Sequence, residues 1–108
     1  MKLAIAQMRL PVPSTLVINA RYQVLGNAGS GAQGTVLRVH DQVRNEDLVL
    51  KAVVRAANAD DGRALIGEFS HLARIEDPGL PRVRDLGVAE SGPLPAGTVF
   101  FTAEQIEG

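Results

Sequence analysis

The sequence predicts an α+β fold in which a five-stranded antiparallel sheet carries one packed helix. Five short segments are rich in β-branched and aliphatic residues, and one amphipathic segment separates the third of them from the fourth. Short polar or glycine-rich links join the strands, and such links suit antiparallel neighbours. Three strands, a helix and two more strands are therefore expected to form one sheet with the helix packed on it.

The expected strands are short and separated by turn-forming residues. They cover residues 21–28, 35–41, 47–55, 82–90 and 98–103. The third is apolar on both faces, which predicts a central position covered on both sides. Residues 1–20 are expected to form an arm, because Pro11 and Pro13 exclude a continuous helix, and within it residues 16–18 could add a short strand or dock on the body. The body is expected to span residues 21–108.

The expected helix follows a polar turn at residues 58–62 and ends near Ile75. Asp60 or Asp61 can cap its start, and both suit the positive end of a helix dipole. The sequence at positions 77–79, Asp-Pro-Gly, is a strong helix breaker. The apolar face of the helix consists of residues spaced by three and four positions: Leu65, Ile66, Phe69, Leu72 and Ala73.

Composition argues against several classes of function. The chain has 108 residues and a net charge of −1, which indicates one domain and gives no support for a nucleic acid or an anionic membrane surface as partner. It has no cysteine, and His40 and His71 lack the spacing of metal ligands, so no metal site is expected. The apolar run at residues 1–6 is too short for a signal peptide, and no stretch approaches the ~20 apolar residues of a membrane span. A cytoplasmic protein is therefore expected.

The strongest functional signal is a glycine-rich segment with the pattern G-x-G-x-x-G-x-V. It is expected to form the turn between the first two strands, where backbone N–H groups without obstructing side chains can approach phosphate oxygens. A dinucleotide-binding fingerprint would need a helix directly after the glycines, whereas residues 35–39 are β-branched and aliphatic. A P-loop is also excluded, because no Gly-Lys-Ser or Gly-Lys-Thr follows. The segment comprises Gly29, Ser30, Gly31, Ala32, Gln33, Gly34, Thr35 and Val36.

Lys51 lies in the third expected strand with three apolar residues on each side. Such a lysine is expected to be poorly solvated and to need an anion, either from a ligand or from a carboxylate. Glu68 is a candidate partner, because at ~100° per residue it lies at the edge of the apolar helix stripe. Alternatives are a hairpin whose lysine merely pairs with a neighbour, a solvated Glu68, and Glu76 or Asp77 as the partner.

These motifs together resemble the N-terminal lobe of the protein kinase superfamily, and most closely that of bacterial serine/threonine kinases of the eukaryotic type. The resemblance covers residues from about Leu10 to Gly108. It places the glycine-rich segment on the loop that covers the phosphates of ATP, Lys51 on the phosphate-pairing lysine and Glu68 on the αC glutamate. Residues 21–25 resemble the lead-in to the first strand, residues 77–80 the link after the αC helix, and residues 100–108 the fifth strand and hinge.

The resemblance also implies a set of site residues. Lys51 and Glu68 take catalytic roles, Ala103 falls at the gatekeeper position, and residues 104–106 fall on the backbone stretch that binds the adenine edge. Val49 stands where a smaller alanine is usual and would narrow the pocket, whereas an alanine gatekeeper would open its rear. Ala28 and Gln33 also depart from the family pattern. The implied ATP contacts are Gly29, Ser30, Gly31, Ala32, Gln33, Gly34, Val36, Val49, Lys51, Ala103, Glu104 and Ile106.

The implied function is transfer of the γ-phosphoryl group of ATP to a protein serine or threonine hydroxyl. The chain has no His-Arg-Asp loop and no Asp-Phe-Gly, so the catalytic base, the Mg²⁺ ligands and the protein-substrate site are expected in a C-terminal lobe after Gly108. This chain alone is therefore expected to be inactive. A pseudokinase or an orphan lobe that binds nucleotide or acts as a scaffold is the main alternative, and a small-molecule kinase is a weaker one. An isolated lobe would expose an apolar face, which predicts dimerisation, partner binding or aggregation.

Overall fold

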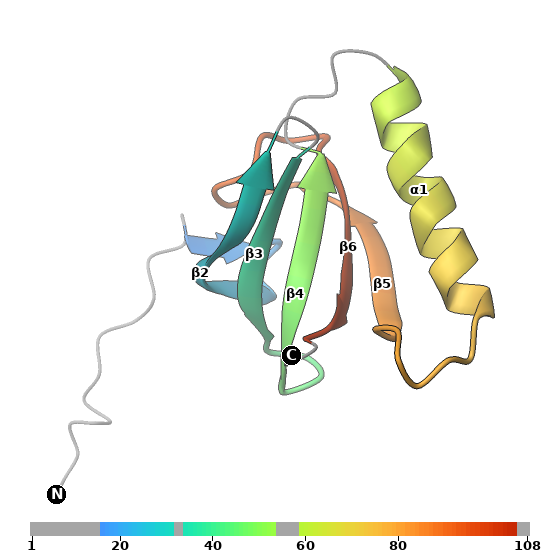
Figure 1. Ribbon diagram of the computed structural model, residues 1–108. Helices are drawn as coiled ribbons and strands as arrows, with labels where there is room; N and C mark the ends of the chain where they lie inside the picture. The colour runs from blue at the N-terminus through green and yellow to red at the C-terminus, as the bar shows by residue number, and fades with distance from the viewer. Residues whose placement is uncertain (1–15, 32–33, 54–58, 106–108) are drawn as a thin grey trace, which may run out of the picture.

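The computed structural model describes residues 16–31, 34–53 and 59–105, and within these it shows a curled antiparallel sheet with one helix beside it (Figure 1). The predicted fold class is confirmed, with one strand more than expected. The helix is α1 (Ala59–Arg74). The strands are β1 (Val17–Ile18), β2 (Tyr22–Gly31), β3 (Gly34–Asp41), β4 (Glu46–Val53), β5 (Val83–Val88) and β6 (Val99–Glu104).

The strand order is β1-β2-β3-β4-β6-β5, and every neighbouring pair is antiparallel. The additional strand, β1, comes from the expected arm: Val17 pairs with Gln23, and Ile18 pairs with Tyr22. Two residues are too few to show the period-2 pattern of a strand, which explains why the sequence left this segment open. The division of the chain at residue 20 stays a prediction.

Two boundaries differ from those expected. The glycines do not form the turn between the first two strands, because β2 continues to Gly31, which pairs with Gly34. Glycine tolerates extended backbone as well as turns, so sequence alone does not separate the two. The helix begins at Ala59, so Asp60 and Asp61 lie inside its first turn rather than in front of it. Residues 54–55 of the expected third strand lie outside the described part of the chain.

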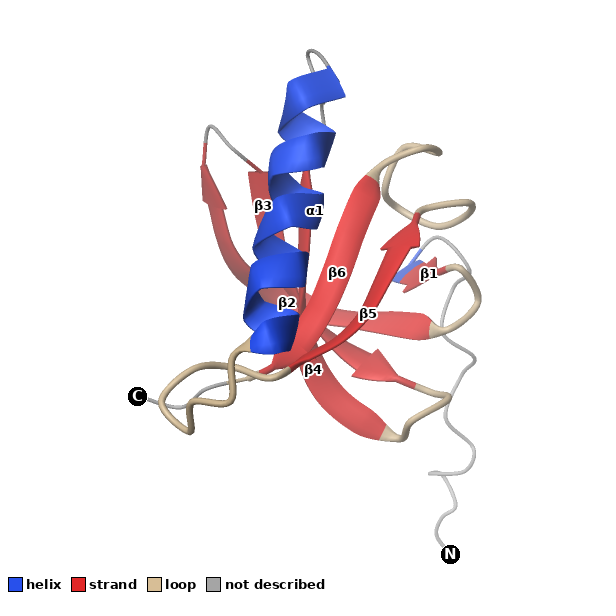
Figure 2. Ribbon diagram, turned by 90° about the vertical axis from the view of Figure 1, so that its right-hand side faces the viewer, coloured by secondary structure: helices blue, strands red, loops and turns tan. Residues whose placement is uncertain are grey.

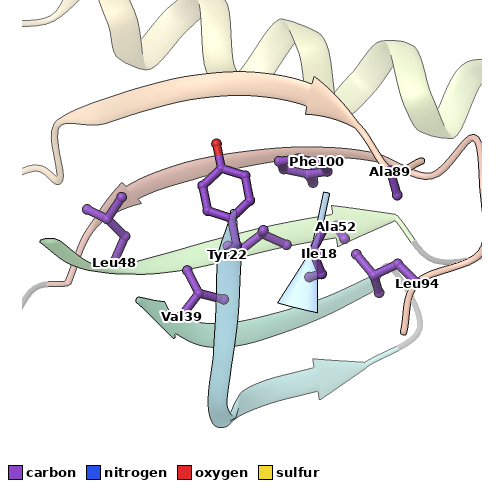
Figure 3. Close-up of a cluster of buried hydrophobic side chains, with 9 residues drawn as sticks. Ile18, Tyr22, Val39, Leu48, Ala52, Ala89, Leu94 and Phe100 are labelled. Atoms are coloured by element: carbon purple, nitrogen blue, oxygen red, sulfur yellow. The ribbon is translucent and has the colours of Figure 1, made fainter. Parts of the chain in front are cut away.

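The inner face of the curled sheet encloses the main core (Figure 3). Alternate residues of β4 point into it, and Leu48, Leu50 and Ala52 are fully buried. Tyr22 and Phe100 meet there edge to face, with ring centroids 5.6 Å apart. Burying one large apolar side chain of this kind stabilises a fold by about 1.5–3 kcal/mol. The other members of the core are Ile18, Val39, Ala89 and Leu94, with Val24 and Leu37 packed against it.

The outer face of the sheet carries α1 (Figure 2), which packs on β4, β5 and β6. Leu65, Phe101 and Ala103 form the buried centre of this layer, and the ring of Phe69 packs at a tilt against that of Phe101, with ring centroids 5.7 Å apart. The third expected strand, β4, has the central position that was predicted, but its outer face is only half-buried, because one helix covers part of it. The predicted helix stripe is also too wide, since Ile66 is 40% exposed and Ala73 is exposed.

The two ends of the curled sheet meet at a seam, which we define by Asn19, Arg21 and Asp85. The Asn19 side-chain amide donates to the carbonyl oxygen of Val88 (3.0 Å) and its Oδ1 accepts the N–H of Glu90 (2.7 Å). Its backbone N–H also donates to the carbonyl oxygen of Ser91, at 3.0 Å. β1 is thereby tied to the loop between β5 and β6.

A charged network completes the seam. The carboxylate of Asp41, fully buried, accepts two bonds of 2.8 Å from the Arg21 guanidinium. Arg21 and Arg44 each also donate to Asp85 at 3.0 Å. Burial raises the pKa of Asp41, but the bonds from Arg21 and from the backbone N–H groups of Arg44 and Val43 outweigh burial, so this pKa is lowered overall. The hydrogen bond with Asp41 raises the pKa of Arg21. The network therefore holds ionised groups at the joint between β2, β3 and β5.

Candidate functional site

Lys51 and Glu68 form an ion pair between β4 and α1. The Lys51 ammonium donates to both carboxylate oxygens of Glu68, at 2.9 and 3.0 Å. The helix places Glu68 at the edge of its packed stripe, next to the strand that carries the lysine. The two alternative carboxylates are not the partner: Asp77 caps the turn at Gly79 (2.8 Å), and Glu76 is exposed. The catalytic roles of the pair stay predictions.

The surroundings of Lys51 differ from those expected. The side chain of Lys51 is 39% exposed and that of Glu68 is 41% exposed, so the pair is not buried in an apolar strand. Strand alternation explains the difference: the apolar neighbours Leu50 and Ala52 point to the inner core, and Lys51 points to the outer face. An exposed ion pair contributes only about 0.2–1 kcal/mol to stability. Neither residue is therefore required to hold the fold together.

The outer face of the sheet brings five of the twelve predicted ATP contacts together in two cross-strand rows. Residues directly opposite each other in neighbouring strands share a face, and so do residues two apart in one strand. The first row consists of Gly26, Arg38, Val49 and Ala103, and the second consists of Gly29, Val36, Lys51 and Phe101. Of these five, Gly29, Val36 and Lys51 lie in the second row, whereas Val49 and Ala103 lie in the first, so the face has two chemically different ends.

The glycine-rich segment lies where β2 and β3 pair, and it adjoins the second row at Gly29. An added Cβ on Gly29 would meet no atom within 4 Å, so the space beside this backbone is open. Its N–H already donates to Oδ1 of Asn27 at 2.8 Å. Gly34 has a φ of 144°, and a Cβ there would collide with the carbonyl oxygen of Ala52, so this glycine is required by the packing of β3 on β4. Ser30 and Gly31 continue β2, whereas Ala32 and Gln33 lie outside the described residues.

The predicted base end lies at the end of β6. Ala103 is only 3% exposed and belongs to the cluster around Leu65 and Phe101, so the rear of the site is not open at this residue. The carboxylate of Glu104 turns to β5, where it accepts the N–H of Arg82 at 3.0 Å and lies 3.5 Å from the Arg84 guanidinium. The backbone N–H of Glu104 also donates to the carbonyl oxygen of Arg82, at 2.8 Å, so both this N–H and the carboxylate are engaged within the fold. Ile106 lies outside the described residues.

Arg38 is the residue of this face that sequence reasoning missed. It lies two residues after Val36 in β3 and is exposed. The period of a strand could have placed it on the same face, but only the pairing register shows that it lies opposite Val49.

The described residues offer no group of three or more His, Asp and Glu side chains that could hold a metal ion. The described helix also lacks the length and apolar character needed to cross a membrane.

Comparisons with known proteins give one sequence relative and several similar structures. The chain is 28% identical over 99 residues to the DNA damage-responsive serine/threonine-protein kinase RqkA of Deinococcus radiodurans, a match that covers 92% of the chain and 14% of that protein. Two crystal structures of the PknI kinase domain of Mycobacterium tuberculosis, one of them a double mutant, superpose with TM-scores of 0.65 and 0.64. Both are 23% identical; each match covers 91% of the chain, and 38% and 37% of the respective structures. No protein-family profile matches the chain.

Proposed function

Because the chain resembles the N-terminal lobe of bacterial serine/threonine protein kinases in sequence and shares its fold, we propose that it is the ATP-binding lobe of such a kinase. The chain spans 14% of the length of RqkA, so most of a comparable enzyme would lie elsewhere in the protein. In that full-length protein, the lobe would contribute to transfer of a phosphoryl group from ATP to a protein hydroxyl in the cytoplasm.

The Lys51–Glu68 pair is the observation that carries this proposal. A phosphate site needs a fixed positive charge, and the two bonds to Glu68 hold the Lys51 ammonium in one place. Lys51 lies opposite Val36, in the row that begins at Gly29. A cation beside an open glycine backbone fits the phosphates of ATP.

The rest of the outer face fits the remainder of the nucleotide. Val49 is half-buried and offers apolar contact to a base, and the buried Ala103, its partner on β6, closes the face behind it. The carbonyl oxygen of Glu104 and the backbone that follows it would supply hydrogen bonds to the edge of the base, since the Glu104 N–H is engaged by Arg82. ATP brings the phosphoryl group, and this chain binds and orients it. The described residues have no cluster suited to Mg²⁺, so its ligands and the catalytic base would come from the remainder of the full-length protein.

The experiment that tests the proposal is ATP binding by the full-length gene product, with and without Lys51→Met. We expect the substitution to weaken ATP binding by about tenfold or more, because a charge-assisted hydrogen bond to phosphate contributes on the order of 1.5–3 kcal/mol. Thermal unfolding should change little, since the pair is exposed. Arg74→Met, at the exposed end of α1, is the matched control.

Two results would count against the proposal. Unchanged ATP affinity in Lys51→Met would remove the role assigned to Lys51. A wild-type protein that binds ATP but phosphorylates neither itself nor a generic protein substrate would instead favour a non-catalytic nucleotide-binding or scaffold module.

A further inference from the structure

Arg38 lies on the proposed nucleotide face, at the end opposite the phosphate contacts. Its cross-strand neighbours are Gly26 on β2 and Val49 on β4. Lys51 lies one row away, diagonal to Arg38 across β3 and β4, so their Cα atoms are separated by roughly 7–8 Å. The face therefore carries two cations, one in each row.

The structure fixes where the guanidinium of Arg38 lies. A Cβ on Gly26 would approach Nη2 of Arg38 to 2.7 Å and Cζ to 3.5 Å, which means that the guanidinium rests on the bare backbone of β2. The pairing register shifts between Val24 and Gly26 and again between Asn27 and Gly29. Such bulges redirect side chains, and here they place the glycine opposite the arginine. The side chain thus extends along the sheet, away from Lys51.

The hydrogen-bonding capacity of Arg38 is not used within the described part of the chain. No described residue forms a hydrogen bond or ion pair with its side chain, and Arg38 is exposed. Other arginines of the same sheet are engaged: Arg21 binds Asp41 and Asp85, Arg44 binds Asp85, and Arg84 binds Glu46. A planar cation with free donors can lie against an aromatic ring or bond to hydroxyl groups.

We infer that Arg38 is a nucleotide-binding residue that contacts the nucleoside part of the ligand, its base and ribose, rather than the phosphates. The inference rests on the proposed function. Arg38 lies opposite Val49, the proposed base contact, whereas Gly29 and Val36 share the row of Lys51. Its planar, positively charged guanidinium lies over β2 at the nucleoside end of the face, where a base or ribose could contact it.

Titration of the full-length gene product with ATP, ADP and adenosine tests this inference. We expect Arg38→Gln to weaken binding of all three by the same factor, about three- to tenfold, which is the range of a cation–aromatic contact. Lys51→Met should weaken ATP and ADP but leave adenosine binding almost unchanged. Arg74→Gln serves as the matched control for loss of an exposed arginine.

A second variant keeps the charge and moves it. In Gly26→Ala the added Cβ displaces the end of the Arg38 side chain, so we expect a smaller loss, again equal for the three ligands. A loss in Arg38→Gln that increases with the number of phosphates, or no loss at all, would overturn the inference. If Lys51→Met weakens ATP binding and Arg38→Gln does not, the inference fails and the proposed function stands. If the wild-type protein binds no ATP, both fail.

Discussion

Lys51 and Glu68 show how function and stability separate at single residues. Both side chains are more than a third exposed, at 39% and 41%, so their ion pair adds little to the free energy of unfolding. Their two hydrogen bonds nevertheless fix the position of the ammonium group. The sequence could indicate both residues, because one interrupts an apolar strand and the other borders an apolar helix stripe.

Glu68→Gln is expected to reduce phosphoryl transfer more than ATP binding. Glutamine keeps the size of the side chain but loses the charge, so Lys51 remains available to phosphate and is less well fixed. We expect the rate constant kcat to fall about tenfold or more and the Kd for ATP to change by less than about threefold. Steady-state kinetics and ATP titration on the full-length gene product provide the two values. An equal loss in both would indicate a purely structural role for Glu68.

At the scale of elements, the hydrophobic pattern of the sequence and the pairing register of the strands determine different parts of the structure. The helix and five of the strands could be predicted from the sequence, because each shows its own period over enough residues. β1 could not be predicted firmly, because its two residues are too few to show a period and only their pairing with β2 defines it. The surroundings of Arg38 and Asp41 also depend on contacts between elements, which a local pattern does not contain. Local pattern thus locates elements, whereas the groups that elements bring together depend on pairing.

The attachment of β1 depends on Gly92 in the loop after β5. Gly92 has a φ of 107°, and a Cβ there would collide with the carbonyl oxygen of Val17. We expect Gly92→Ala to lower the free energy of unfolding by about 1–3 kcal/mol, because of backbone strain and this clash. Gly67→Ala is the control: Gly67 lies in α1 with no atom within 4 Å of its Cβ position. That change should raise stability by about 0.5–1 kcal/mol. Urea denaturation of the wild type, Gly92→Ala and Gly67→Ala measures the two changes in the free energy of unfolding, which should have opposite signs. Equal changes in the two variants would contradict the role assigned to Gly92.

At the scale of the whole molecule, ion pairs connect strands at the two ends of the curled sheet. Arg21 connects Asp41 at the end of β3 to Asp85 on β5. No local sequence pattern indicates these contacts, since they join residues 20 and 64 positions apart. They make the global fold sensitive to acid.

The lowered pKa of Asp41 sets the direction of that sensitivity. A carboxylate whose pKa is lower in the folded state stabilises the fold above its unfolded pKa of about 3.9, and the stabilisation is lost as pH falls through the folded value. Stability should therefore fall below about pH 4.

Asp41→Asn should cost about 2–4 kcal/mol at pH 7, because it leaves Arg21 without its main partner, and should flatten the acid dependence. Urea denaturation of both proteins from pH 7 to pH 3 measures these effects. Glu76→Gln is the control, since Glu76 is exposed. Parallel pH profiles for the wild type and Asp41→Asn would refute this assignment.

The seam also has a consequence for the newly synthesised chain. It joins segments that are far apart, and Asn19 accepts a hydrogen bond from a backbone group 72 residues later. On a ribosome, the β2–β4 meander can therefore form well before the seam can close. Until the loop after β5 emerges, the edge strands of the β2–β4 meander stay open to pairing with other chains. Aggregation competes with folding at this stage. Slow elongation through residues 54–90 would prolong this exposed interval.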